Sequence, residues 1–312
     1  MACPTDRRPL ITVLTPCYNE EDNVDELCER LRAQFDRLPH IDFRHLLIDN
    51  ASTDGTVAQV MPFVLAGRVR LIDKQVNEGK AMALNDALPM AQGEILLVLD
   101  ADAQPEPDII WRMLPHFRGG RVAAVTGNPR VRNVDNFLTR LQAIEFTSII
   151  SMLRRSQRIW GRIVTVSGVV AAFRKNALFM VEGFSPEMLT EDIEVTWKLQ
   201  RRFFDVRYEP MAIVWMTVPS TVRALFRQRL RWARGLMQVL RKHRGVVADS
   251  LFEQMSGNGV QCKGGSADVD VVANRFIDGG ARAVNMGGST GFEFFRPPLS
   301  EGSPNVEAQR IR

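Results

Sequence analysis

The sequence contains no long apolar run and few cysteines. No stretch approaches the roughly 18 to 20 consecutive apolar residues that a membrane-spanning helix needs. The first charged residues are not followed by an apolar core, so we expect no signal peptide. Four cysteines (Cys3, Cys17, Cys28 and Cys262) show neither a CxxC pair nor metal-ligand spacing, which indicates a reducing compartment without disulfides. We therefore expect a cytoplasmic protein, either free or on the inner face of the cell membrane.

The composition is that of a globular domain with one strongly basic segment. Of 312 residues, 45% are hydrophobic and 24% charged, and the chain is long enough to bury a sizeable core. The formal net charge is only +4, but eight cations crowd into the segment 223–244: Arg223, Arg227, Arg229, Arg231, Arg234, Arg241, Lys242 and Arg244. No nucleic-acid-binding fold is recognisable around them, so we expect no nucleic-acid partner.

Short apolar runs alternate with amphipathic stretches in the first half of the chain, which predicts a parallel sheet with crossover helices. We expect strands at residues 10–14, 45–48, 69–72, 94–99 and 122–125. The helices between them are expected at residues 21–38, 56–64, 80–90 and 107–117. Further along we expect one or two helices over 136–160, a β-like stretch over 163–174, a helix from about 191, and strands near 206–208 and 213–216.

Two of the later helices are amphipathic. The helix expected at 222–243 places apolar residues such as Phe226 and Met237 among its arginines, a pattern typical of a helix lying on an anionic membrane surface. The segment 136–160 has apolar residues at Phe137, Leu141, Ile144, Ile149 and Leu153. It fits either a second interfacial helix or an ordinary helix packed on the sheet.

The last part of the chain differs in composition. Residues 246–312 contain 10 of the 22 glycines and show no sustained helical or strand period. Such a segment buries too little apolar area to offset its ordering entropy. We expect a folded domain over residues 1–245 and a glycine-rich tail of unknown role, without regular structure, over 246–312.

Four polar segments mark the ends of the predicted strands and the start of one helix. Asp100 and Asp102 follow a buried strand, at the edge where open α/β sheets bind their ligands, and such a pair suits a hard divalent cation. The segments 16–21, 49–55 and 77–80 lie at neighbouring positions. Each alone fits ordinary turn chemistry, whereas all four at one sheet edge indicate a binding site.

The same segments carry a family resemblance. TPCYNEEDN, IDNASTDGT, NEGKAMALNDAL and LDADAQPEPD resemble the nucleotide-binding half of family 2 glycosyltransferases. VTGNPRVRN, VSGVVAAFRKNAL, LTEDIEVTWKLQ, YEPMAIVW and QRLRWARG resemble the bacterial poly-β-1,6-N-acetylglucosamine synthases of that family, and more distantly the cellulose, chitin and hyaluronan synthases. The resemblance implies an α/β GT-A fold, with a mixed, mainly parallel sheet flanked by helices, a nucleotide-sugar half over 1–130, an acceptor half over 131–245, and amphipathic interfacial helices after it.

The resemblance also implies a role for each motif residue. The donor, a UDP-sugar, would be bound by Pro16, Glu20, Asn50, Gly79, Lys80, Asp100, Gln228 and Arg231. Asp102 would bind Mg²⁺ or Mn²⁺, and Asp192 would be the general base. The glycan acceptor would contact Ser167, Gly168, Glu191 and Trp232. Structural roles are the alternative for Glu191, Asp192 and Trp232. Acids are favoured in the first turn of a helix, and a tryptophan often packs in the core.

Taken together, these features predict inverting, metal-dependent transfer of N-acetylglucosamine from its UDP derivative to a growing glycan. Asn50 stands where many family members have an acid that accepts a hydrogen bond from uracil. The identity of the donor's nucleobase is therefore not fixed by this motif. Blocks up to about residue 66 also resemble polyprenyl-phosphate sugar transferases, so single transfer to a lipid phosphate is an alternative. The polymer synthases have spanning helices after QxxRW, and residues 246–312 contain none. A truncated, inactive nucleotide-sugar-binding module is therefore a third hypothesis.

Overall fold

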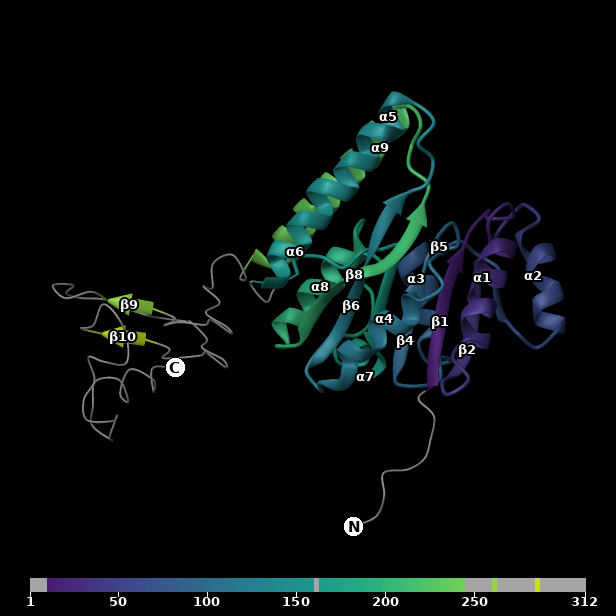
Figure 1. The fold of residues 1–312 in the computed structure, drawn as a ribbon, viewed down its shortest axis with the longest axis horizontal. Helices are drawn as coiled ribbons and strands as arrows, with labels where there is room; N and C mark the ends of the chain where they lie inside the picture. The colour runs from purple at the N-terminus through teal and green to yellow at the C-terminus, as the bar shows by residue number, and fades with distance from the viewer. Residues whose placement is uncertain (1–9, 160–162, 245–259, 263–283, 287–312) are drawn as a thin grey trace, which may run out of the picture. The chain divides into compact units, whose positions relative to one another are not determined.

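The computed structural model describes residues 10–159, 163–244, 260–262 and 284–286. Within them lies an eight-stranded sheet of order β3-β2-β1-β4-β7-β6-β8-β5 (Figure 1). The strands are β1 (Leu10–Cys17), β2 (Asp42–Asn50), β3 (Arg70–Lys74), β4 (Ile95–Leu99), β5 (Gln104–Pro105), β6 (Val122–Val131), β7 (Val170–Arg174) and β8 (Asp205–Met216). The helices are α1 (Val24–Asp36), α2 (Thr56–Leu65), α3 (Lys80–Ala87), α4 (Ile109–Met113), α5 (Phe137–Ile144), α6 (Ser151–Ile159), α7 (Lys175–Met180), α8 (Glu191–Arg201) and α9 (Val222–Lys242).

The sheet is mixed and mainly parallel, as the resemblance implies. β1 pairs in parallel with both β2 and β4, and β2 pairs in parallel with β3. β7 runs antiparallel between β4 and β6, while β8 runs parallel to β6. The four parallel strands β1 to β4 therefore end at one edge of the sheet, where the predicted polar segments meet.

Helices cover both faces of the sheet because successive side chains of a strand point to opposite faces. In β4, Leu96 and Val98 pack with residues of α3, α7 and α8, whereas Ile95, Leu97 and Leu99 pack with residues of α1 and α4. All five side chains are buried, which accounts for a strand that is apolar at every position rather than at alternate ones.

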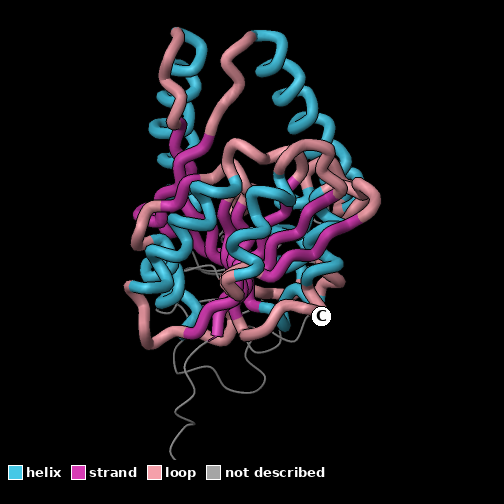
Figure 2. The backbone as a smooth tube through the Cα atoms, turned by 90° about the vertical axis from the view of Figure 1, so that its right-hand side faces the viewer, coloured by secondary structure: helices cyan, strands magenta, loops and turns pink. Residues whose placement is uncertain are grey.

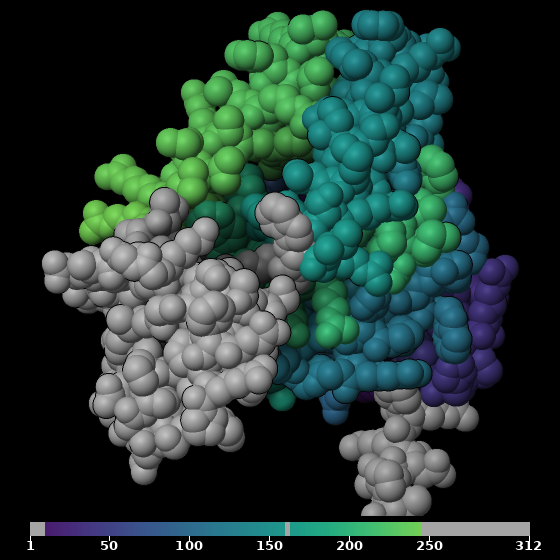
Figure 3. Space-filling view, turned by 60° about the vertical axis from the view of Figure 1, so that its left-hand side comes forward, coloured from purple at the N-terminus to yellow at the C-terminus, as the bar shows by residue number. Residues whose placement is uncertain are grey.

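Two helical arms, α5-η2-α6 and α9, rise from the same end of the sheet (Figures 2 and 3). The segment η2 (Glu145–Ile150) is a π-helical insertion between α5 and α6. Asn136 caps α5, since its Oδ1 accepts a hydrogen bond from the Thr139 backbone N–H at 2.9 Å. The Arg229 guanidinium on α9 forms a 2.6 Å ion pair with Glu145 on the other arm. None of the described helices combines the length and apolarity that crossing a membrane requires.

Several element boundaries differ from the sequence prediction. The helix expected from residue 21 begins at Val24, because the backbone N–H groups of Asn23 and Val24 donate to the Glu20 carbonyl in a turn. The β-like stretch over 163–174 is a strand only from Val170. The two short strands near 206–208 and 213–216 form one continuous strand, β8. Its pairing with β6 continues through two shifts of register, so the residues between the two expected strands also belong to β8. The two-residue β5 and the π-helical η2 had no signal in the sequence.

The chain divides into two compact units, Met1–Val239 and Leu240–Arg312. In the second unit, β9 (Val260–Cys262) and β10 (Val284–Met286) pair in parallel. No strand was expected there, and each of these is only three residues long. The predicted lack of structure over 246–312 otherwise falls outside the described residues. We propose that the catalytic domain ends near residue 245, close to the end of α9.

Candidate active site

The loops that follow β1 and β2 are tied together at the carboxyl edge of the sheet. The Asn19 backbone N–H donates to Ser52 Oγ at 2.9 Å, and Thr53 N–H donates to Asn19 Oδ1 at 2.8 Å. The Gly55 N–H donates to Glu21 Oε2 at 2.7 Å. These bonds give the loop after Pro16, the second-last residue of β1, a fixed shape.

Glu20 lies in this loop, close to the acids that follow β4. Its backbone N–H donates to Thr56 Oγ1 at 2.8 Å, and its carboxylate accepts from Asn23 Nδ2 at 2.8 Å. Burial, with the negative charges of Asp102 and Asp100, raises the pKa of Glu20. Glu20 and the two acids of the Asp-x-Asp pair therefore act on one another electrostatically at this edge of the sheet.

Asn50 connects the end of β2 to the loop before α3. Its side-chain amide donates to Asn77 Oδ1 at 2.7 Å, and its Oδ1 accepts from the Glu78 backbone N–H at 3.4 Å. Asn77 Oδ1 also accepts from the Gly79 N–H at 3.0 Å. Gly79 has a φ of 85°, a conformation that favours glycine. Asn50 thus shapes the segment that precedes Lys80, and its contact with a nucleobase stays a prediction.

Lys80 is the centre of the acidic cluster. Its ammonium lies 2.5 Å from Asp100 Oδ1, 2.8 Å from the Gly168 carbonyl oxygen and 3.7 Å from Glu191 Oε1. Burial opposes the charge of this lysine, but the carboxylates of Asp100 and Glu191 outweigh that effect and raise its pKa. One cation therefore joins α3, the end of β4, the loop before β7 and the start of α8.

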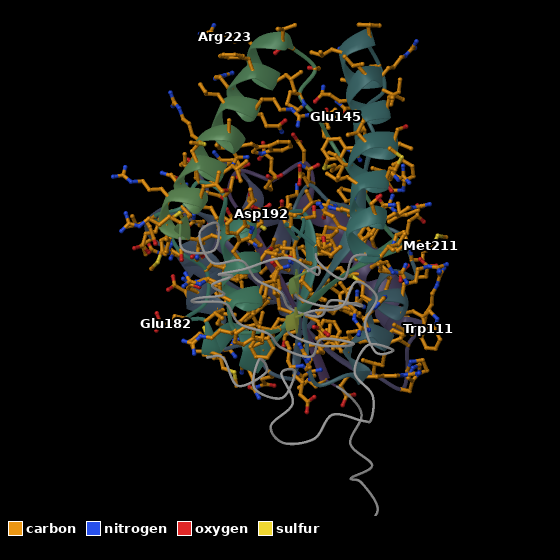
Figure 4. The ribbon with its side chains drawn as sticks, turned by 90° about the vertical axis from the view of Figure 1, so that its left-hand side faces the viewer. Trp111, Glu145, Glu182, Asp192, Met211 and Arg223 are labelled. Carbon is orange, nitrogen blue, oxygen red and sulfur yellow. The ribbon has the colours of Figure 1, made fainter. Side chains whose placement is uncertain are left out.

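Asp192 lies beside this cluster, and in the view of Figure 4 it stands between the two helical arms. A Cβ on Gly168 would lie 3.2 Å from Asp192 Oδ2 and 3.7 Å from Lys80 Nζ, so glycine leaves the space that the carboxylate occupies. Burial, and then the charge of Glu191, raise the pKa of Asp192 to about 6, against the effect of Lys80. A carboxyl with such a pKa suits proton transfer near neutral pH.

Ser167 is buried next to Gly168, and its backbone N–H donates to Thr126 Oγ1 at 2.7 Å. This bond ties the segment that contains Gly168 to β6. The predicted acceptor residues Ser167, Gly168 and Glu191 are thus neighbours of Asp192 in the fold, although 23 positions separate Gly168 from Glu191 in the sequence.

Asp102 is half-buried, and burial and the neighbouring Asp100 raise its pKa to about 6, while Lys80 and Arg132 oppose the rise. The described residues hold no group of three or more acids, histidines or cysteines arranged to bind a metal. Mg²⁺ and Mn²⁺ fit this site nevertheless, because such ions are often held by one or two carboxylates together with substrate phosphates. Arg132, which lies in the VTGNPRVRN block, acts on Asp102, although the sequence assigned it no role.

The QxxRW residues lie on α9. Gln228 is half-buried and Arg231 exposed, and within the described part of the chain no hydrogen bond or ion pair links either to the acidic cluster. Trp232 packs against the apolar cluster of Val131 and Phe146. The Arg229 guanidinium lies 4.4 Å from the centroid of the Trp232 ring. This packing favours a core role for Trp232, and its contact with an acceptor stays a prediction.

Gly235 lets α9 approach the start of α8. A Cβ at this position would lie 2.9 Å from the Cβ of Thr190, the buried residue just before Glu191 and Asp192. We expect Gly235→Ala to destabilise the domain by about 1–3 kcal/mol, because the added methyl group cannot fit. In an open helix the same change stabilises by about 1 kcal/mol. A fall in the melting temperature of Gly235→Ala would therefore indicate close contact between α9 and Thr190, whereas a rise would indicate an open helix position.

The exposed neighbour Arg234 provides the control for this prediction, since Arg234→Ala removes a side chain from the same helix turn without touching Thr190. We also expect Gly235→Ala, but not Arg234→Ala, to slow sugar transfer, because the start of α8 holds Asp192. A melting temperature that rises in Gly235→Ala would show that α9 does not press on α8 at this point.

Residues 12–179 match the family model described as glycosyl transferase family 2. The chain belongs to glycosyltransferase family 2. A poly-β-1,6-N-acetyl-D-glucosamine synthase of Staphylococcus epidermidis is 38% identical over 231 residues, which cover 74% of this chain and 55% of that protein. The chain thus spans about half the length of the curated family members that it matches. The resemblance inferred from the motifs is confirmed.

Solved structures show the same fold. The mannosyltransferase PcManGT from Pyrobaculum calidifontis, in complex with GDP-Man and Mn²⁺, is 26% identical with a TM-score of 0.63, over 77% of this chain and 66% of that one. Staphylococcus aureus TarS 1-349, in complex with UDP-GlcNAc, is 18% identical with a TM-score of 0.50, over 68% and 59% of the two chains. The predicted GT-A fold is confirmed, and the chain is a glycosyltransferase domain.

Proposed function

We propose that this domain transfers N-acetylglucosamine from UDP-N-acetylglucosamine to a growing glycan, with a divalent cation and with inversion at the anomeric carbon. The observation that supports this most is the convergence of Lys80, Asp100, Gly168 and Asp192 at the carboxyl edge of the sheet. The choice of sugar follows the name of the staphylococcal synthase that is 38% identical.

The proposed reaction begins with the acceptor hydroxyl. Asp192 accepts its proton while the hydroxyl oxygen bonds to the anomeric carbon of the donor. The bond from that carbon to the diphosphate breaks on the opposite face, so the configuration inverts and the nucleoside diphosphate leaves. Lys80 supplies positive charge beside the leaving group. A cation held by Asp102 would neutralise further charge on the diphosphate.

A panel of radiolabelled donors, with product sizing, tests the proposal. UDP-N-acetylglucosamine, UDP-glucose and GDP-mannose are supplied with and without Mn²⁺, with and without lipid, and with either an oligosaccharide or a polyprenyl phosphate as acceptor. We expect label from UDP-N-acetylglucosamine in oligosaccharide products, and only with the cation. Label that appears only in polyprenyl phosphate would support the single-transfer alternative. UDP binding without transfer or donor hydrolysis would indicate an inactive binding module.

GDP-mannose belongs in the panel for a specific reason. The side chain of Asn50 already forms hydrogen bonds with Asn77 and with the Glu78 backbone N–H. Many family members have at this position an acid that accepts a hydrogen bond from uracil. PcManGT, at 26% identity, is in complex with GDP-Man. A guanosine donor is therefore the second candidate, and competition between UDP and GDP for the labelled donor distinguishes the two.

We also propose that the helical arms dock on an anionic membrane surface at the inner face of the cell membrane. The two arms expose large apolar residues: Phe137, Leu141, Ile144, Ile149, Met152, Leu153 and Ile159 on one arm, and Val222, Phe226, Leu230, Leu236 and Met237 on the other. Exposed arginines on α9, among them Arg223 and Arg227, add charge that complements anionic headgroups.

Flotation with vesicles tests this docking. We expect the chain to bind vesicles that contain anionic phospholipid and to bind neutral vesicles weakly, with a loss of binding in high salt. Phe226→Glu should weaken binding by about 10- to 100-fold, because burial of a phenylalanine side chain contributes roughly 1.5–3 kcal/mol. Leu65 is 81% exposed on α2, away from the arms, so Leu65→Glu serves as the control. Equal losses in the two variants would contradict docking through the arms.

A further inference from the structure

Asn85 on α3 binds the backbone of a residue 99 positions further along the chain. Its side-chain amide donates to the Phe184 carbonyl oxygen at 2.7 Å, and its Oδ1 accepts from the Phe184 backbone N–H at 2.8 Å. Phe184 is buried, and its ring packs edge-on against Phe173 of β7, with the ring centroids 5.7 Å apart. One side chain therefore satisfies both backbone polar groups of a buried loop residue, which are costly to leave unpaired.

Gly183 allows the loop to come this close to α3. Its φ is 67°, in the region that favours glycine. A Cβ at this position would lie 2.5 Å from Asn85 Oδ1 and 3.2 Å from Leu88 Cδ1. The residue before Phe184 therefore leaves free the space that the Asn85 amide occupies.

The loop 183–185 is also bound by α8. The Lys198 ammonium donates to the Gly183 carbonyl oxygen at 2.6 Å and to Ser185 Oγ at 3.2 Å. Lys198 belongs to the helix that has Asp192 in its first turn. The loop therefore links α3 to the helix that carries the proposed general base.

A second link between the two helices lies at the active site. Lys80, the first residue of α3, has its ammonium 3.7 Å from Oε1 of Glu191, the first residue of α8. An ion pair of this length tolerates many orientations. The two hydrogen bonds of Asn85 are short and directional, and their partner is backbone, so they restrict the movement of α8 relative to α3 more tightly.

We propose that Asn85 is a positioning residue for sugar transfer, which holds Asp192 on α8 in its place relative to Lys80 on α3. This inference rests on the proposed role of Asp192 as the general base. The space around that carboxylate is small, because a Cβ on Gly168 would lie 3.2 Å from its Oδ2. A shift of α8 by about 1 Å would move the carboxylate away from the acceptor hydroxyl, and such a misplacement costs about 10²-fold in rate.

The test compares Asn85→Ala and Asn85→Asp with wild type. Hydrogen exchange of backbone amides, followed by mass spectrometry in peptides that cover 183–196, reports the order of this region without any need for sugar transfer. In parallel, kcat is measured with saturating donor, and the affinity for UDP is measured by calorimetry in the presence of Mn²⁺. Asn85→Asp keeps the acceptor for the Phe184 N–H and loses the donor for its carbonyl oxygen.

In Asn85→Ala we expect faster exchange over 183–196 and a kcat that is about 10- to 100-fold lower, with a nearly unchanged affinity for UDP. Asn85→Asp should show smaller changes in the same direction, because one of the two hydrogen bonds remains. Gly183→Ala pushes on the Asn85 amide from the loop side and should also speed exchange over 183–196 and lower kcat. If Asn85→Ala does not fold, Asn85→Asp and Gly183→Ala decide.

Asn133 provides a matched control, because its side chain makes the same pair of hydrogen bonds elsewhere. Its amide donates to the Val218 carbonyl oxygen at 2.8 Å, and its Oδ1 accepts from the Val218 N–H at 2.8 Å. Asn133→Ala removes the same two bonds from a different loop. It should lower the melting temperature as Asn85→Ala does, yet leave exchange over 183–196 as in wild type.

Two results would overturn the proposal. Exchange that is faster throughout the domain in Asn85→Ala, or an equal effect of Asn133→Ala on 183–196, would show that Asn85 serves stability alone. A normal kcat in a variant with faster exchange over 183–196 would show that transfer does not depend on this link. If wild type transfers no sugar but exchange changes as expected, Asn85 does hold α8 in place and it is the proposed function that fails.

Discussion

Asp192→Asn should lower the rate of sugar transfer by about 10²- to 10⁴-fold while the affinity for the nucleotide sugar stays nearly unchanged. The amide has the shape of the carboxyl group but cannot accept the proton of the acceptor hydroxyl. In wild type, the rate should rise with pH around a midpoint of about 6, where Asp192 becomes ionised. Asp192→Asn should lose this dependence, as initial rates from pH 5 to pH 9 will show.

The stability of Asp192→Asn separates a catalytic role from a structural one. Burial raises the pKa of Asp192 above its unfolded value, so the folded state holds its proton more tightly, and the carboxyl costs stability as pH rises from about 4 to about 6. At pH 8 the variant should therefore melt at the same temperature as wild type or higher. Asp135 is exposed, so Asp135→Asn is the control. A variant that binds UDP poorly yet transfers sugar normally once saturated would make Asp192 a binding residue.

The alternation of short apolar runs with amphipathic stretches predicted the nucleotide-binding part of the fold well. A strand that is apolar at every position and ends in Asp100 and Asp102 is typical of a central parallel strand with its ligand edge at those acids. Patterns of this kind report local geometry and burial. They contain no information on β5, which has only two residues, or on the way β7 enters antiparallel between β4 and β6.

The arm α5-η2-α6 shows where an amphipathic pattern misleads. Its apolar positions, such as Phe137 and Ile144, are exposed, so the hypothesis that this face packs on the sheet is wrong. The inward face carries Gln142, Ser151 and Arg154, which are buried. The Gln142 amide donates to the Pro219 carbonyl oxygen at 2.8 Å, a partner that only tertiary structure provides. Buried polar residues with backbone partners leave no period in the sequence.

The composition of the acidic cluster followed from motifs, whereas its geometry did not. Lys80, Asp100 and Asp192 stand in separate segments of the sequence. The strand ends predicted one edge for Lys80 and Asp100, and only the family resemblance added Asp192. In the structure Lys80 binds Asp100, 20 positions away, and the carbonyl of Gly168, 88 positions away. Contacts at such separations depend on the strand order, which places β7 directly beside β4.

Asp102→Ala should abolish transfer, with a rate loss of about 10³-fold or more, in a protein that remains folded. The leaving diphosphate loses the counter-charge that a cation at Asp102 would supply. Calorimetric titration of Mn²⁺ into the protein with UDP should show binding in wild type and not in the variant. Since burial and Asp100 raise the pKa of Asp102 to about 6, Mn²⁺ binding to wild type should also weaken below that pH.

Asp108 provides the matched control, because it lies six positions further along the same segment and its carboxylate pairs with Arg112 at 2.6 Å on the surface. Asp108→Ala removes the same group and should change neither Mn²⁺ binding nor transfer. Circular dichroism of both variants checks that each is folded. Removal of a carboxylate from a crowded acidic site lowers repulsion between Asp102 and Asp100, so Asp102→Ala should melt no lower than wild type in the absence of metal. Full activity in Asp102→Ala, or in wild type with excess chelator, would rule out a metal at this position.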